Sequence, residues 1–164
     1  MLFRSRDRPA DSESVSSRTF RDAGVPASLI TVLADRGITT PSPIQAATLP
    51  DSLAGRDLLG RGRTGSGKTY AFLLPLVARL EASGRRPAAK RPRAVILAPT
   101  RELVTQIEES LAPLARVAGL SVRTVFGGVG QTPQVKALAA GVDVDRKSTR
   151  LNSSHRCTRM PSSA

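Results

Sequence analysis

The sequence predicts an α/β fold with a mainly parallel sheet, and three observations lead to this expectation. Short apolar runs typical of strands alternate along the chain with segments of helical periodicity. A glycine-rich sequence of the phosphate-loop type lies between one such strand and one such helix, the order that this motif requires. The chain has 164 residues, 40% of them hydrophobic, which suits one domain with a core.

Two helices are predicted near the start. The first covers 26–36, with apolar residues on one face and Gly37 as its stop signal. The second begins after Ser42 as the N-cap and runs towards Gly55. Because Pro50 lies inside the second helix, we expect a bend or break there.

The rest of the chain continues the alternation. Buried strands are predicted at 57–59 and 93–98, and further strands at 121–126 and from 142. Helices are predicted at 69–80, from 99 to about 114, and at 131–140. The helix after 99 carries apolar residues at helical spacing, namely Leu103, Val104, Ile107, Leu111 and Leu114. Residues 81–92, rich in basic and turn residues, predict a surface loop.

Charge and composition narrow the function. The formal net charge of +12 favours a polyanionic partner such as RNA, DNA or nucleotide. His155 and Cys157 stand near the end, so residues 1–144 contain no catalytic His or Cys and no Cys/His zinc site. We expect a disordered arm at 1–17, no signal peptide, no membrane span and a cytoplasmic location.

The phosphate-loop motif is G-x-x-x-x-G-K-[ST], whose glycines let backbone N–H groups converge on a phosphate at a helix N-terminus. Lys68 can reach the β- and γ-phosphates and the Thr69 hydroxyl can ligate Mg²⁺, so these two are the predicted catalytic residues. The predicted phosphate-binding residues are Gly62, Arg63, Thr64, Gly65, Ser66, Gly67, Lys68 and Thr69.

Four motifs in order resemble the first RecA-like domain of a DEAD-box ATP-dependent RNA helicase. Phe20 followed by G-I-T-T-P-S-P-I-Q at 37–45 is similar to the Q motif, and R-T-G-S-G-K-T at 63–69 is similar to motif I. P-T-R-E-L at 99–103 is similar to motif Ia, and a Gly127-Gly128 doublet follows. The resemblance covers 18–144, with the Q motif at 18–46. The family usually has Ala-Gln where this chain has Gly62-Arg63.

The resemblance implies ATP and Mg²⁺ as cofactors and ATP hydrolysis coupled to RNA unwinding. It places Gln45 against adenine, whose N6 donor and N7 acceptor match the acceptor and donor of a Gln amide. The alternative is a Gln on the helix surface. Phe20 resembles the aromatic residue that packs on the adenine, and the alternative is a core aromatic.

The resemblance also implies RNA-backbone contacts by Pro99, Thr100, Arg101, Gly127 and Gly128. Such contacts carry little sequence specificity and depend strongly on salt. Arg101 and Glu102 could instead form a local ion pair, and the glycine doublet could simply end a strand. The oligomeric state stays open.

Parts of the family pattern are missing. No D-E-A-D motif, with its Mg²⁺-binding Asp and water-activating Glu, follows Val144. Residues 145–164 are instead similar to a translated sequencing adapter, which predicts a non-native tail; the alternative is a genuine basic terminus. We therefore expect an incomplete RecA-like P-loop NTPase domain with half an ATP site, marginal packing, weak or no hydrolysis and no unwinding.

Two other interpretations remain. One is another P-loop enzyme, such as a DNA helicase or a transport ATPase, against which the Pro-Ile-Gln setting of Gln45 argues. The other is a short, non-enzymatic module that binds nucleotide or RNA.

Overall fold

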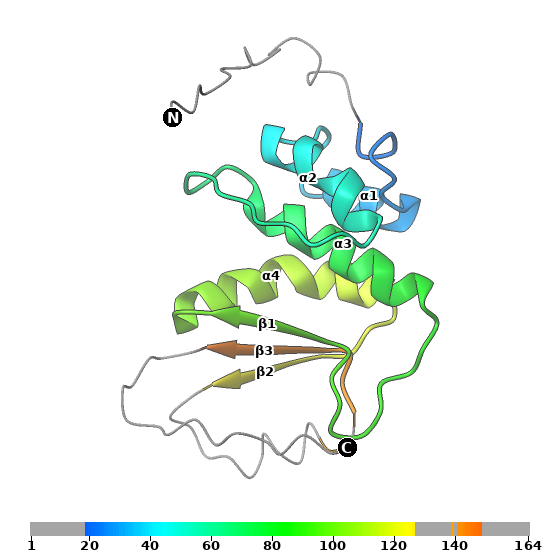
Figure 1. The fold of residues 1–164 in the computed structure, drawn as a ribbon, viewed down its shortest axis with the longest axis vertical. Coiled ribbons are helices and arrows are strands. Elements are labelled where there is room, and N and C mark those ends of the chain that lie inside the picture. Colours follow the sequence, from blue (N-terminus) through cyan, green and yellow to red (C-terminus); the bar gives the residue numbers. More distant parts are fainter. Residues whose placement is uncertain (1–18, 127–138, 140, 149–164) are drawn as a thin grey trace, which may run out of the picture. The chain divides into compact units, whose positions relative to one another are not determined.

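The computed structural model describes residues 19–126, 139 and 141–148 (Figure 1). The chain forms two compact units. One is helical and comprises 1–85 and 110–120, and the other holds the sheet and comprises 86–109 and 121–164. The predicted arm at 1–17, the Gly127-Gly128 doublet and, apart from Ala139, the predicted helix at 131–140 lie outside the described residues.

The helical unit contains α1 (Ala27–Ala34), α2 (Pro43–Leu53), α3 (Lys68–Ala82) and the last part of α4 (Arg101–Val117). Helices α2 and α3 pack against each other. Large apolar side chains with essentially no exposed surface form the core of this unit. They are Phe20, Leu29, Leu33, Leu49, Leu73, Leu74, Val77, Leu111 and Leu114.

The two predicted glycine stops are confirmed. Gly37 has φ +72° and Gly55 has φ +88°, a left-handed conformation that favours glycine. After α1, the Ile38 N–H donates to Leu33 O at 2.9 Å, and the Gly37 N–H donates to Ala34 O at 2.9 Å. This paired pattern satisfies carbonyls at the end of the helix, so the helix ends where the glycine stands.

The expected break at Pro50 does not occur, because α2 is continuous from Pro43 to Leu53. Pro50 lies in the second half of this short helix, where it removes only one backbone donor. Two side-chain hydrogen bonds support the surrounding turns. Thr48 Oγ1 donates to Ile44 O at 2.7 Å, and Ser52 Oγ donates to Thr48 O at 2.8 Å.

The predicted buried strand at 57–59 is wrong. These residues have no regular secondary structure, and Leu58 and Leu59 are 47% and 91% exposed. A strand requires a neighbour to receive its backbone hydrogen bonds, and no described strand pairs with this segment. The apolar composition of residues 57–59 is a local property, whereas formation of a strand depends on a partner strand elsewhere in the chain.

The sheet unit confirms the parallel α/β prediction. Among the described residues it contains β1 (Ala94–Ala98), β2 (Val122–Phe126) and β3 (Val144–Ser148), in the order β1-β3-β2 (Figure 1). Both pairings are parallel, with Val144 opposite Ala94 and Val122. The predicted boundary between 144 and 145 therefore falls inside the central strand.

The side chains of strand β1 are more exposed than the predicted buried strand at 93–98 would have them. Val95 and Leu97 are 53% and 63% exposed, whereas Ala98 is buried. Because alternate residues of a strand point to opposite faces, these two exposed side chains share one face. Helix α4 shows the expected pattern more closely, since Val104 and Ile107 are buried, although Leu103 is 36% exposed.

A buried carboxylate joins the amino ends of the sheet. Asp143 is 4% exposed, and its Oδ1 accepts a hydrogen bond from Arg93 Nη1 at 2.6 Å. Its Oδ2 accepts from the Ser121 N–H at 2.9 Å and from Ser121 Oγ at 3.0 Å. Burial raises the pKa of the Asp143 carboxyl, but the hydrogen bonds from Ser121 and Arg93 outweigh it and hold the pKa below its usual value.

We expect Asp143→Asn to lower the free energy of unfolding at neutral pH by about 1–3 kcal/mol, because an amide cannot serve all these donors. The folded-state pKa is depressed, so the contribution is complete above the unfolded pKa of about 3.9. It is lost as pH falls through the folded pKa, and the difference between parent and variant should shrink below about pH 4. Urea denaturation across this range measures it. The exposed carboxyl of Asp35 gives the control Asp35→Asn, and an equal cost in both variants would contradict the prediction.

Candidate nucleotide-binding site

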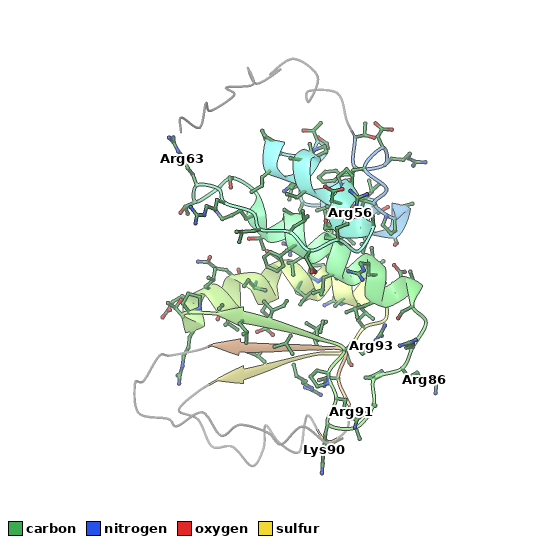
Figure 2. All side chains as sticks on the ribbon, viewed as in Figure 1. Arg56, Arg63, Arg86, Lys90, Arg91 and Arg93 are labelled. Atoms are coloured by element: carbon green, nitrogen blue, oxygen red, sulfur yellow. The ribbon has the colours of Figure 1, made fainter. Side chains whose placement is uncertain are left out.

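The glycine-rich segment turns sharply into α3. Gly65 and Gly67 have φ of +79° and +89°, and Gly67 immediately precedes the helix. The Ser66 N–H donates to Arg63 O at 3.2 Å, which closes the turn. Figure 2 shows Arg63 at the outer end of this loop, pointing away from the helices of its unit. The two glycines permit a loop that brings backbone N–H groups to a helix N-terminus.

Gln45 connects this loop to α2. Its side chain is 3% exposed, and Nε2 donates a hydrogen bond to Gly67 O at 2.9 Å. Its Oε1 accepts a hydrogen bond from the Ser42 N–H at 2.9 Å. The alternative of a Gln on the helix surface is therefore excluded. These bonds use one amide N–H and one oxygen lone pair, and a Gln amide has a second of each.

The backbone of Gly67 lies close to this amide. A Cβ at Gly67 would stand 2.5 Å from Ser42 Oγ and 2.7 Å from Gln45 Nε2. Such distances are far below van der Waals contact, so both the conformation and the space require glycine here. Gly65 differs, because a Cβ there would meet nothing within 4 Å.

Lys68 begins α3, and its ammonium group is held by the loop. Nζ donates to Gly62 O at 2.6 Å and to Arg63 O at 2.5 Å. An ammonium group has three donors and no acceptor, so it can exchange these carbonyls for phosphate oxygens. Thr69 follows in the first turn of the helix, where the positive end of the helix dipole also favours an anion.

The loop has features that suit a phosphate. Ser66 Oγ is buried and has no hydrogen-bond partner among the described residues. A Cβ at Gly62 would lie 2.7 Å from this same oxygen, so the missing side chain leaves room beside it. A phosphate oxygen can accept from a serine hydroxyl and from backbone N–H groups together, so the residues present fit this ligand.

Pro99, Thr100 and Arg101 belong to the sheet unit and follow the carboxyl end of β1. Thr100 caps α4, since its Oγ1 accepts a hydrogen bond from the Leu103 N–H at 3.2 Å. Its carbonyl accepts from the Val104 N–H at 3.2 Å. The Thr100 hydroxyl hydrogen is not used by this cap and can be donated to another acceptor, as the prediction of RNA contact requires.

Residues 42–148 match the family model described as DEAD/DEAH box helicase, which is more than half of the chain. The chain belongs to the DEAD/DEAH box helicase family. The match includes Ser42, Gln45, the phosphate loop and Pro99–Arg101, and it continues through β3.

Individual proteins show the same relationship. The ATP-dependent RNA helicase RhlB of Sodalis glossinidius is 42% identical over 134 residues, covering 79% of this chain and 32% of that protein. The ATP-dependent RNA helicase DeaD of Escherichia coli K12 is 42% identical over 127 residues, 77% of this chain and 19% of that protein. The chain therefore spans about a third or less of these relatives.

A solved structure is similar as well. The crystal structure of the RNA helicase Prp28 from Chaetomium thermophilum matches with a TM-score of 0.70 and 39% identity. The match covers 80% of this chain and 32% of that one. The incomplete RecA-like fold expected from the DEAD-box motifs is thereby confirmed.

Phe20 is the residue expected, from the resemblance to DEAD-box helicases, to pack on adenine. In this structure Phe20 is 1% exposed and belongs to the core, in a turn closed by the Val25 N–H donating to Phe20 O at 3.0 Å. The ring therefore has no free face for a base, and this arrangement is that of a core aromatic. A stacking role for Phe20 stays a prediction.

The described residues offer little for a metal beyond Thr69. They contain no group of three or more His, Cys, Asp or Glu side chains that could hold an ion. Mg²⁺ commonly takes only one or two protein ligands and completes its shell with phosphate oxygens and water. Coordination by the Thr69 hydroxyl stays a prediction. No helix in the described part of the chain has the length and apolar character of a membrane span.

Sequence reasoning missed one aspect of this site. Ser42 was expected as an N-cap and Gln45 as an adenine reader, but their spacing is also that of a capping box. That spacing was the available signal for the bond between Gln45 Oε1 and the Ser42 N–H. A hydrogen bond from Arg36 Nη1 to the Tyr70 hydroxyl, 3.1 Å long, had no comparable signal.

We expect Gly67→Ala to destabilise the helical unit more than Gly65→Ala. Both changes place alanine at a positive φ, which costs about 1–2 kcal/mol. Only the change at Gly67 also forces a Cβ into Ser42 and Gln45, and losing that hydrogen bond adds about 1–3 kcal/mol. Urea denaturation followed by circular dichroism compares the two. Equal destabilisation would show that the contact with Gln45 contributes nothing.

Proposed function

We propose that this chain is the ATP-binding portion of a DEAD-box RNA helicase, which couples ATP binding and hydrolysis to the unwinding of RNA duplexes. The observation that carries the proposal is the hydrogen bond between Gln45 and Gly67. It fixes an amide that can recognise adenine beside a loop that can bind phosphate. The Prp28 structure from Chaetomium thermophilum was solved bound to ADP, which supports a nucleotide as the ligand.

Each residue has a role in this proposal. The backbone of Gly62–Gly67 cradles phosphate oxygens, and the Ser66 hydroxyl donates to one of them. Lys68 leaves the carbonyls of Gly62 and Arg63 and contacts the β- and γ-phosphates, where its charge stabilises the transferring group. A bound Mg²⁺, held by the Thr69 hydroxyl and the nucleotide, would neutralise charge on the phosphate oxygens.

Base recognition falls to Gln45. The amide has a second N–H for adenine N7 and a second lone pair for the adenine amino group, and its buried side chain must open to the base for these bonds to form. Guanine presents a carbonyl oxygen in place of that amino group, so the pairing would lose its donor. ATP should therefore bind better than GTP. Phe20 is proposed to pack on the adenine, which requires its ring to leave the core.

RNA binding is assigned to Pro99, Thr100 and Arg101 at the start of α4. A helix N-terminus and a threonine hydroxyl both favour a phosphate group, and neither contacts base edges. We therefore propose binding to the RNA backbone without sequence preference, with Gly127 and Gly128 adding contacts.

The activity of the chain itself is expected to be low. Its 164 residues contain no D-E-A-D sequence and cover about a third or less of the curated relatives. Positioning of water and stabilisation of the transition state need those acidic groups. We propose that the chain binds nucleotide weakly and does not unwind RNA, and that residues 145–164 are not native.

Lys68→Ala should weaken binding of a fluorescent ATP analogue about tenfold or more, because a charge-assisted contact to phosphate is lost. Lys90→Asn removes the same charge from an exposed turn outside the site and should leave ATP binding unchanged. Phosphate release by the parent should not exceed that of Lys68→Ala. Hydrolysis clearly above this level would contradict the proposed inactivity.

Gln45→Ala should reduce the preference for ATP over GTP, measured by competition against the same analogue. The parent should prefer ATP by about tenfold or more, as one well-placed bidentate contact gives. A purely structural Gln45 would instead lower both affinities equally and keep their ratio. Gln106→Ala, on an exposed face of α4, serves as the control.

A further inference from the structure

A short basic turn lies outside the site described above. We name Arg86, Lys90 and Arg91 the basic turn, and all three side chains are exposed (Figure 2). They precede β1, which begins at Ala94. Among the described residues no carboxylate forms an ion pair with any of them. The proposed ATP and RNA contacts use none of the three.

The turn has a defined conformation. Ala88 and Arg91 form an antiparallel bridge, and the Arg91 N–H donates to Ala88 O at 3.1 Å. Lys90 has φ +61° and is the non-glycine residue with a left-handed backbone in the described chain. This conformation reverses the chain within four residues, from Ala88 to Arg91, and the three basic residues lie within six positions of one another in the sequence.

Both ends of the segment are anchored to the sheet unit. On one side, the backbone of Gly141 lies against it, since a Cβ there would stand 3.1 Å from Pro87 O and 3.3 Å from Ala88 O. On the other side, Arg93 is fixed by Asp143 at 2.6 Å. The backbone that carries the basic turn is therefore held in place before any ligand arrives, which lowers the backbone entropy lost on binding.

The position of the turn separates it from the proposed RNA contacts. It lies at the amino ends of the parallel strands, whereas Pro99–Arg101 follow the carboxyl end of β1. Five residues of β1 separate the two, or roughly 16 Å at about 3.3 Å per residue. One small ligand cannot contact both edges, but an extended polyanion can.

We propose that the basic turn is a second contact surface for the phosphate backbone of RNA, remote from the motif that follows β1. This inference rests on the proposed function, because RNA is the partner in both. Clustered cations attract a phosphodiester chain through release of its counterions. The turn presents prolines and alanines beside its cations and no large apolar side chain of the kind that anchors a membrane or a protein partner.

The test uses the 164-residue chain and a fluorescein-labelled oligouridylate, with affinity measured across a tenfold range of salt. The test variant combines Arg86→Gln, Lys90→Asn and Arg91→Gln, in which Asn suits the left-handed backbone. Its control removes the same charge from dispersed exposed positions, through Arg21→Gln, Arg116→Gln and Arg123→Gln. A second variant, Arg86→Lys with Arg91→Lys, keeps the charge. Circular dichroism and ATP binding confirm that each variant is folded.

Removing three phosphate contacts should make the slope of log K against log salt shallower by about 2. Over the tenfold range, the parent should lose about 100-fold more affinity than the test variant. The dispersed control should change the slope by less than half as much, and the charge-keeping variant should match the parent. Equal slopes for test variant and control overturn the inference.

A further variant shows whether a negative result concerns the basic turn alone or the proposed RNA binding as a whole. Arg101→Gln should weaken RNA binding if the motif after β1 contacts RNA, whatever happens at the basic turn. If Arg101→Gln lowers RNA affinity while the basic-turn variant behaves like its dispersed control, the proposed function is supported and the second contact surface is rejected. Complete absence of RNA binding by the parent would reject both.

Discussion

The side-chain amide of Gln45 fixes the phosphate loop to the helix before it. A buried amide without partners would be costly, because it loses water and gains nothing in return. Here the amide is hydrogen-bonded to Ser42, the N-cap of its own helix, and to Gly67 at the end of the loop. Movement of the loop away from α2 would therefore break the bond to Gly67 and leave a buried amide N–H without a partner. The absence of a Cβ at Gly67 makes the approach possible. The nucleotide recognition proposed for Gln45 and the conformation of the loop would thereby depend on the same few atoms.

In the sheet unit, a buried charged group with hydrogen-bond partners likewise fixes the local structure. Asp143 accepts three hydrogen bonds from Arg93 and Ser121, and these residues stand at the amino ends of all three described strands. Inside a protein such bonds are stronger than in water, and an unpaired member is correspondingly expensive. Among the described residues, each unit thus contains one buried polar side chain in addition to its apolar core.

Local signals predicted where the described helices lie, because this information is contained within a few residues, although the break expected at Pro50 does not occur. Gly37 and Gly55 end helices through a backbone conformation that the glycine itself permits. The segment 57–59 failed for the opposite reason, since its composition cannot say whether another strand is there to pair with it. For Gln45, the sequence contained two signals. The resemblance to the Q motif predicted a base contact, and the spacing of Ser42 and Gln45 was that of a capping box, which the structure shows in the bond from the Ser42 N–H to Gln45 Oε1.

The net positive charge predicted a polyanion as the partner, but only the structure shows which basic side chains already have partners within the protein. Arg93 is paired with Asp143, and Lys68 is held by the loop carbonyls of Gly62 and Arg63, which a phosphate would replace in the proposed function. In the proposed function the phosphate loop binds through directional N–H groups, so its affinity would depend on geometry and would withstand salt better. The basic turn is proposed to act through its charge on an anchored backbone, so its contribution would depend on counterion release. The two proposed anion-binding surfaces could therefore be distinguished by ionic strength, without a mutation in either.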